Sequence, residues 1–135
     1  MPLQILIDFY ALVVKKTMED LLIILKTPPY RKELSKLALD LAITFAIFEQ
    51  KVSILLIGDG CLQLHPDQNT EHSSHRNQLK TLASLNFYEI NNVYIESNSF
   101  NKTGLNSYEL NETFKIISCD SAKQLIADSD HILGF

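Results

Sequence analysis

An apolar run that ends at a Gly-Asp-Gly turn constrains the fold of this chain most. Residues 51–57 read Lys-Val-Ser-Ile-Leu-Leu-Ile, and beyond the first residue only Ser53 interrupts the apolar side chains. Such a run predicts a strand buried on both faces, as parallel strands covered by helices are. Gly58 and Gly60 then permit a sharp turn at the carboxyl end of the strand, where open α/β sheets place their sites. We therefore predict an α/β fold with Cys61 on that rim.

Length and composition limit the possible classes of protein. The 135 residues are 46% hydrophobic and 21% charged, which is typical of a single domain with one core. A net charge of −4 and the lack of a basic run argue against direct binding of nucleic acid. Cys61 and Cys119 are too few for a disulfide framework, so we expect reduced thiols in the cytoplasm.

The first 17 residues differ from the rest. Residues 2–14 are mostly apolar, but Asp8 interrupts them, and Lys15 and Lys16 follow the apolar run instead of preceding it. This order does not fit a signal peptide, and the run is too short to span a membrane. We expect residues 1–17 to be an N-terminal extension, with Met18 as the natural start of a domain over residues 18–135; an additional strand or helix is the alternative.

The remaining pattern alternates between strands and helices. Besides the central strand, apolar segments predict strands at 21–25, 93–96, 114–118 and 131–135. Helical spacing predicts helices at about 32–48 and 79–85, and a third that Asp120 or Ser121 caps. This alternation with short connections predicts one domain with a mainly parallel, five-stranded, flavodoxin-like sheet between layers of helices.

The helix at 32–48 is apolar on nearly all sides. We expect one set of its residues to face the sheet: Leu34, Leu37, Ala38, Leu41, Phe45 and Phe48. The other side is also apolar, and in a domain of this size it most plausibly contacts another subunit. We predict an interface formed by Leu39, Ile43 and Ile47.

The sequence offers few groups for catalysis or ligand binding. Glu71, His72 and His75 could be drawn as a metal site, but solvated loop residues explain them better, because no further ligands lie nearby. The Gly-Asp-Gly turn matches no phosphate-binding pattern. Neither Cys61 nor Cys119 has a neighbouring cation, so a structural role is favoured for both thiols. We expect neither a cofactor nor a metal.

Three stretches together resemble a known family. They are Gly-Asp-Gly-Cys-Leu-Gln-Leu at 58–64, Thr-Pro-Pro-Tyr at 27–30 and the closing His-Ile-Leu-Gly-Phe at 131–135. On these motifs, residues 18–135 resemble the DsrE/DsrF-like family. The resemblance implies a three-layer α/β fold and a cytoplasmic heterohexamer containing two copies each of three related subunits, so that TusB-like and TusD-like chains would be the partners.

The resemblance also implies a function. In such complexes persulfide sulfur passes from TusA to TusE and ends as 2-thiouridine at the wobble position of certain tRNAs. The family's main carrier cysteine follows the third strand of a different subunit, and Glu96 occupies the matching position here. This implies a structural role in assembly instead of catalysis. The alternative is a sulfurtransferase in its own right, with Cys61 as the persulfide carrier.

Overall fold

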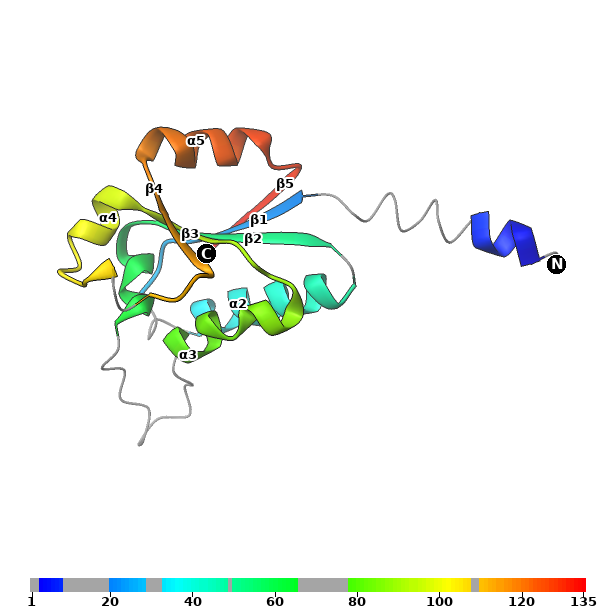
Figure 1. The fold of residues 1–135 in the computed structure, drawn as a ribbon, viewed down its shortest axis with the longest axis horizontal. Helices are drawn as coiled ribbons and strands as arrows, with labels where there is room; N and C mark the ends of the chain where they lie inside the picture. The colour runs from blue at the N-terminus through cyan, green and yellow to red at the C-terminus, as the bar shows by residue number, and fades with distance from the viewer. Residues whose placement is uncertain (1–2, 9–19, 29–32, 49, 66–77, 108–109) are drawn as a thin grey trace.

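A five-stranded, all-parallel sheet forms the centre of the molecule (Figure 1). The computed structural model describes residues 3–8, 20–28, 33–48, 50–65, 78–107 and 110–135. The strands are β1 (Asp20–Leu25), β2 (Lys51–Leu56), β3 (Val93–Glu96), β4 (Phe114–Ile117) and β5 (His131–Gly134), in the order β4-β3-β2-β1-β5. The predicted five-stranded α/β fold is confirmed, although flavodoxin itself has a different strand order.

Helices cover both faces of this sheet. The helical elements are α2 (Leu34–Ile47), η1 (Gly58–Leu64), α3 (Gln78–Ala83), η2 (Leu85–Tyr88), α4 (Ser97–Asn101) and α5 (Cys119–Asp128), where η denotes a 3₁₀ helix. Figure 1 shows α2 and α3 on one face and α5 on the other. The chain steps from β1 to β4 in one direction, and α5 returns it to β5 beside β1. Crossovers between parallel strands are right-handed. The connections that run from β1 towards β4 therefore place α2 and α3 on one face, and the connection that returns to β5 places α5 on the other.

The alternation of side chains along the central strands creates two hydrophobic clusters. In β1, Leu21, Ile23 and Leu25 point towards α2 and α3, whereas Leu22 and Ile24 belong to the cluster that contains Ala122 of α5. Both sets are buried. The uninterrupted apolar runs of β1 and β2 follow directly from this burial on two faces.

Helix α2 contacts the sheet through a face that the predicted division only partly matches. Ala38 is buried as predicted, and the half-buried Phe45 also packs against the core. Leu39, predicted to face outwards, is buried as well, whereas three residues predicted to face the sheet are exposed, namely Leu34, Leu37 and Phe48. The predicted division of the helix faces is therefore wrong at these four positions. Both faces are apolar, so periodicity alone could not distinguish them, and a serine at the buried position 35 made the inner face look more polar than it is.

Three local predictions need correction. The segment after the predicted strand at 93–96, which the sequence indicates as a loop containing Gly104, begins with the short helix α4, and the predicted sharp turn at Gly58 continues as the seven-residue 3₁₀ helix η1. Helix α5 begins at Cys119, and its cap is Ser118, whose hydroxyl oxygen accepts a hydrogen bond from the backbone N–H of Ser121 at 3.1 Å. Because β4 ends at Ile117, only Ser118 lies between strand and helix.

The N-terminal residues contribute one described segment. Residues 3–8 are helical, and their apolar side chains Leu3, Ile5, Leu6 and Ile7 are about half exposed or more. Among the helices that the structure describes, none is long and apolar enough to cross a membrane.

The orientation of α2 predicts different effects for two leucine substitutions on the same helix. Leu39→Ala removes a fully buried side chain, so we expect it to lower the free energy of unfolding by about 2 to 5 kcal/mol. Leu37→Ala, at a side chain that is 48% exposed, should cost less than about 1 kcal/mol. Urea denaturation followed by circular dichroism measures both values, and a larger loss for Leu37→Ala would refute the observed orientation.

Deletion of residues 1–17 tests the predicted domain boundary. All five strands begin at or after Asp20, so we expect the shortened chain to fold with a melting temperature within a few degrees of that of the full chain. For a domain of this size a loss of 1 kcal/mol lowers the melting temperature by only a few degrees. A decrease of ten degrees or more would mean that residues 1–17 belong to the folded domain.

Candidate functional site

The carboxyl ends of the five parallel strands lie at one edge of the sheet, here called the carboxyl rim. The rim contains η1 after β2, Glu96 at the end of β3, and Cys119, which follows β4 after Ser118. Glu96 pairs in register with Ile117, which places Glu96 and the start of α5 on neighbouring strands. The structure thus brings the three sequence-predicted residues Cys61, Glu96 and Cys119 to the same edge.

The two glycines of the turn are needed for different reasons. Gly58 has a φ angle of 54°, in the left-handed region that glycine adopts most easily. Gly60 is buried, and a Cβ atom there would lie 2.0 Å from the backbone oxygen of Leu25. The turn is therefore pressed against the end of β1, and only glycine fits at position 60.

Cys61 lies beneath the rim instead of on its surface. Its side chain is fully buried, and Sγ donates a hydrogen bond to the backbone oxygen of Leu56 at 3.6 Å. Burial, and secondarily the negative charge of Glu96, raise the pKa of this thiol to about 12. Because the thiolate is the nucleophile, a buried and protonated Cys61 is a poor acceptor of sulfur. The structure thus gives a physical argument against the alternative in which Cys61 is the carrier.

Gln63, in the same turn, is part of a buried polar cluster. Its Nε2 donates hydrogen bonds to Ser35 Oγ at 2.9 Å and to the backbone oxygen of Thr27 at 3.3 Å. The hydroxyl of Ser35 in turn donates to the backbone oxygen of Pro28 at 3.1 Å. Both side chains are fully buried. Gln63 thereby joins the turn after β2 to the loop after β1 and to the first turn of α2.

Glu96 caps α4 with its own side chain. Its carboxylate accepts hydrogen bonds from the backbone N–H groups of Asn98 at 2.9 Å and Ser99 at 2.8 Å, and from the Ser99 hydroxyl at 2.7 Å. The Ser99 hydroxyl is the main reason why the pKa of Glu96 is lowered, and the two backbone donors also lower it. The carboxylate is thus ionised at neutral pH and is held in place.

Cys119 is the exposed thiol of the rim. It is the first residue of α5, and its side chain is accessible, unlike that of Cys61. An accessible thiol can react with large partners or reagents from solution, which a buried one cannot. Exposure, which the sequence could not reveal, thus separates the two cysteines.

The predicted interface residues are not equivalent in the structure. Leu39 is fully buried in the core, Ile43 is half-buried and packs against the core, and Ile47 is 63% exposed. Leu39 is therefore not available to another subunit. Residues that are accessible on α2 are Leu34, Leu37, Leu41, Ile47 and Phe48, here called the outer stripe of α2.

Glu71, His72 and His75, which the sequence analysis weighed as a metal site and interpreted as solvated loop residues, lie outside the described residues. Within the described part of the chain, no group of three or more His, Cys, Asp or Glu side chains could hold a metal ion.

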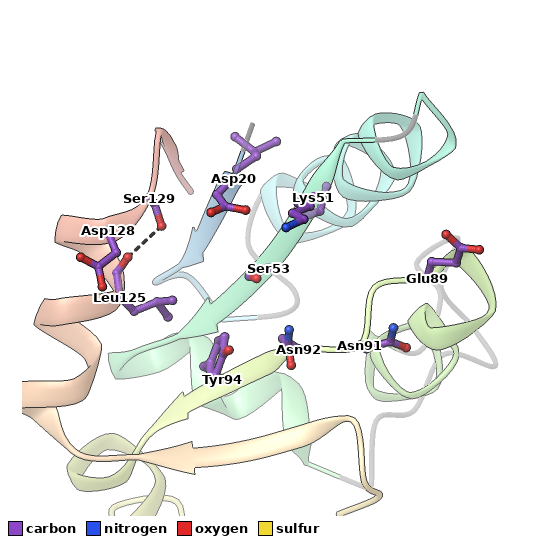
Figure 2. Close-up of a pocket in the computed structure, with 12 residues that line it drawn as sticks. Asp20, Lys51, Ser53, Glu89, Asn91, Asn92, Tyr94, Leu125, Asp128 and Ser129 are labelled. Atoms are coloured by element: carbon purple, nitrogen blue, oxygen red, sulfur yellow. Dashed lines mark hydrogen bonds between the residues drawn. The ribbon is translucent and has the colours of Figure 1, made fainter. Parts of the chain in front are cut away.

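A cavity of about 390 Å³ opens at the opposite, amino-terminal edge of the sheet (Figure 2). It lies between the last turn of α5 and the beginnings of β1, β2 and β3, and Figure 2 shows Asp20, Lys51, Tyr94 and Asp128 among its lining residues. Neither Cys61, Glu96 nor Cys119 lines it. The cavity is thus separate from the carboxyl rim.

Comparison with known proteins identifies the family. The model of the DsrE/DsrF-like family matches residues 19–135. The chain belongs to the DsrE/DsrF-like family. It is similar to the Protein TusC homolog of Pseudomonas aeruginosa, with 24% identity over 85% of this chain and 97% of the relative. Protein TusC of Buchnera aphidicola subsp. Acyrthosiphon pisum is 33% identical over 58% of this chain and 66% of its own length.

Two further comparisons agree with this DsrE/DsrF-like assignment. The intracellular sulfur oxidation protein DsrF of Allochromatium vinosum is 26% identical over 73% of this chain and 82% of its own length. The crystal structure of the ychN protein from E. coli superposes with a TM-score of 0.74 at 20% identity, over 87% of this chain and all of that one. The latter likeness supports the three-layer fold alone.

Three serines that the sequence did not single out organise this DsrE/DsrF-like rim. Ser35 and Ser99 hold Gln63 and Glu96, and Ser118 caps α5. Of these, only Ser118 carried a usable signal, because serine directly before a helix is a common cap. Glutamate is not a preferred cap residue, so nothing in the sequence predicted the pairing of Glu96 with Ser99.

The two thiols should differ strongly in reactivity. We expect iodoacetamide at pH 7.5 to modify Cys119 at least about a hundredfold faster than Cys61 in the folded chain, because only Cys119 is exposed. Peptide mass spectrometry of timed samples measures both rates. In Cys119→Ser the fast reaction should disappear, and in urea both cysteines should react alike. Equal rates in the folded wild-type chain would contradict the burial of Cys61.

Proposed function

We propose that this chain is a TusC-like subunit of a cytoplasmic sulfur-relay complex. In this proposal the complex contains two copies each of this chain and of TusB-like and TusD-like partners, and it passes persulfide sulfur from a TusA-like donor to a TusE-like acceptor. The sulfur serves 2-thiolation of the tRNA wobble uridine. Membership of the DsrE/DsrF-like family and similarity to proteins named TusC and DsrF support the proposal.

Within the complex, we assign this chain a role in assembly instead of sulfur transfer. The observation that carries this assignment is the state of Glu96, which stands where the resemblance places a carrier cysteine. Its carboxylate cannot form a persulfide, and three hydrogen bonds hold it as a helix cap. In the described structure the carboxylate of Glu96 is thus engaged in hydrogen bonds to α4.

The chemistry of transfer further supports a non-catalytic role. To accept sulfur, a thiolate attacks the outer sulfur of a donor persulfide; a new S–S bond forms, the donor's S–S bond breaks, and the donor leaves as a thiolate. Cys61 is buried, and its pKa of about 12 keeps it protonated at neutral pH. This disfavours the alternative in which Cys61 is a persulfide carrier.

The composition is consistent with an indirect contribution to tRNA modification. A net charge of −4 and the lack of a basic run in the sequence argue against direct binding to the phosphate backbone of tRNA. Partner proteins would therefore make the contacts with RNA, and this chain would contact proteins only.

The outer stripe of α2 is the proposed contact with a partner subunit. Leu37, Ile47 and Phe48 are 48%, 63% and 69% exposed, and Phe87 of the neighbouring η2 is 83% exposed. Exposed apolar surface of this kind on a soluble protein usually marks a contact site. This revises the predicted interface, since Ile47 remains in it and Leu39 does not.

A charge in the outer stripe should prevent assembly without unfolding the subunit. We expect Ile47→Glu and Leu37→Glu to give folded chains by circular dichroism that no longer co-purify with TusB-like and TusD-like partners, because the new carboxylate would be buried without a partner. Lys123→Glu, at an exposed position of α5 on the opposite face of the sheet, should assemble normally. If the wild-type chain does not co-purify, the proposed complex is wrong; if both stripe variants do, the interface lies elsewhere.

A further inference from the structure

One carboxylate connects three elements of the carboxyl rim. Glu96, at the end of β3, accepts hydrogen bonds from Asn98 and Ser99 in the first turn of α4. The hydroxyl of Ser99 donates to the carboxylate at 2.7 Å and also accepts a hydrogen bond from the backbone N–H of Gly58 at 2.8 Å. Gly58 begins η1, which contains Cys61. A continuous path of hydrogen bonds therefore joins the end of β3 to the beginning of η1, the helix that contains Cys61.

The contact with Gly58 is more than a helix cap requires. Two backbone N–H donors already occupy the carboxylate, and they would cap α4 without the Ser99 hydroxyl. The hydroxyl extends the cap to a segment 41 residues away in the sequence. Hydrogen bonds to an ionised group are stronger than those between neutral groups, so the charge of Glu96 fixes the position of this hydroxyl.

The other end of η1 is fixed independently. Gly60 packs against the backbone of Leu25, and Gln63 is bound to Ser35 and Thr27. The beginning of η1 has the contact with Ser99 instead, and Gly58 itself is exposed to solvent. Opening of η1 from the side of Gly58 thus requires the bond to Ser99 to break.

We propose that Glu96, acting through Ser99, is a positioning residue that fixes the beginning of η1, so that Cys61 within η1 stays buried and does not take up sulfur. Glu96, Ser99 and Gly58 are here called the rim clamp. That persulfides reach this rim rests on the proposed function, whereas the fixing of η1 by the clamp does not. The clamp would let sulfur pass through the complex without being captured by this subunit.

The charge of Glu96 acts in the same direction as the geometry. An ionised carboxylate near the thiol disfavours a second negative charge, and it contributes to the raised pKa of Cys61. The hydroxyl of Ser99 is the largest cause of the lowered pKa of Glu96, and the charge of Lys102 lowers this pKa by a smaller amount. The attack of a Cys61 thiolate on a donor's outer sulfur is therefore opposed both by burial and by charge.

Thiol labelling and amide hydrogen exchange test the clamp on the full chain in a Cys119→Ser background, where Cys61 is the remaining thiol. Glu96→Gln removes the charge that strengthens the bonds to Ser99 and replaces one acceptor oxygen by an NH2 group, so that Asn98 and Ser99 can no longer both donate to this side chain. We expect iodoacetamide to modify Cys61 about tenfold faster or more, and the amide of Gly58 to exchange correspondingly faster. Glu112→Gln, at an exposed glutamate before β4, should change neither rate.

A second variant separates the clamp from the stability of α4. Ser99→Ala retains the backbone N–H donors to Glu96 but removes the bond to Gly58. We expect faster labelling of Cys61 and faster exchange at Gly58, while exchange at Asn98 and at Ile54 of the buried strand β2 stays unchanged. Unchanged rates at Cys61 and Gly58 in Ser99→Ala would overturn the proposal. So would an acceleration at Ile54 equal to that at Gly58, because it would mean global unfolding.

These measurements use the isolated full chain, so their outcome does not depend on the relay. In the assembled complex, loading with a persulfide donor should add the mass of one sulfur atom to Cys61 in Glu96→Gln and not in the wild-type chain. Failure to co-purify with TusB-like and TusD-like chains would refute the proposed function and leave the clamp intact. If the chain assembles with its partners but Ser99→Ala does not change the labelling rate of Cys61 in the isolated chain, the clamp alone is refuted.

Discussion

The hydrogen bond between Gln63 and Ser35 fixes how the chain around the rim is assembled. It joins η1 to the first turn of α2 across 28 residues of sequence, and both side chains are fully buried. A buried polar group that loses its partner costs about 1 to 3 kcal/mol, so α2 is favoured with Ser35 facing inwards. This orientation places Ala38, Leu39 and Ala42 on the sheet and leaves the outer stripe exposed.

The carboxyl rim that results has little freedom to rearrange. Gly60 is pressed against Leu25, Gln63 is bound to α2, and Gly58 is bound to Ser99. Such a rim is suited to present a constant surface to partner proteins. Because Cys61 is buried in this rim, its thiol cannot accept sulfur without a rearrangement, which supports the proposed role in assembly.

The two ends of the sheet differ in how their polar side chains are arranged. At the carboxyl end, Glu96 and Gln63 are buried and hydrogen-bonded within the protein, and Cys119 is the accessible thiol. At the amino end, Asp20, Lys51 and Asp128 line a cavity instead (Figure 2). The Gly-Asp-Gly-Cys-Leu-Gln-Leu stretch at 58–64 and the residues discussed for sulfur chemistry all belong to the carboxyl end, where open parallel sheets place their sites.

The sequence by itself determined the α/β class, the five strands to within one or two residues, and the position of the rim. These follow from local signals, because a strand buried on two faces needs a continuous apolar run and a turn pressed on a neighbouring strand needs glycine. Only the tertiary structure decided which face of α2 is buried, that Cys61 is inaccessible, and that Glu96 caps α4 and reaches η1 through Ser99. The contacts from Gln63 to Ser35 and from Ser99 to Gly58 join residues 28 and 41 positions apart. Helical periodicity records only that a face is apolar, and the partner that buries it is set by contacts far along the chain.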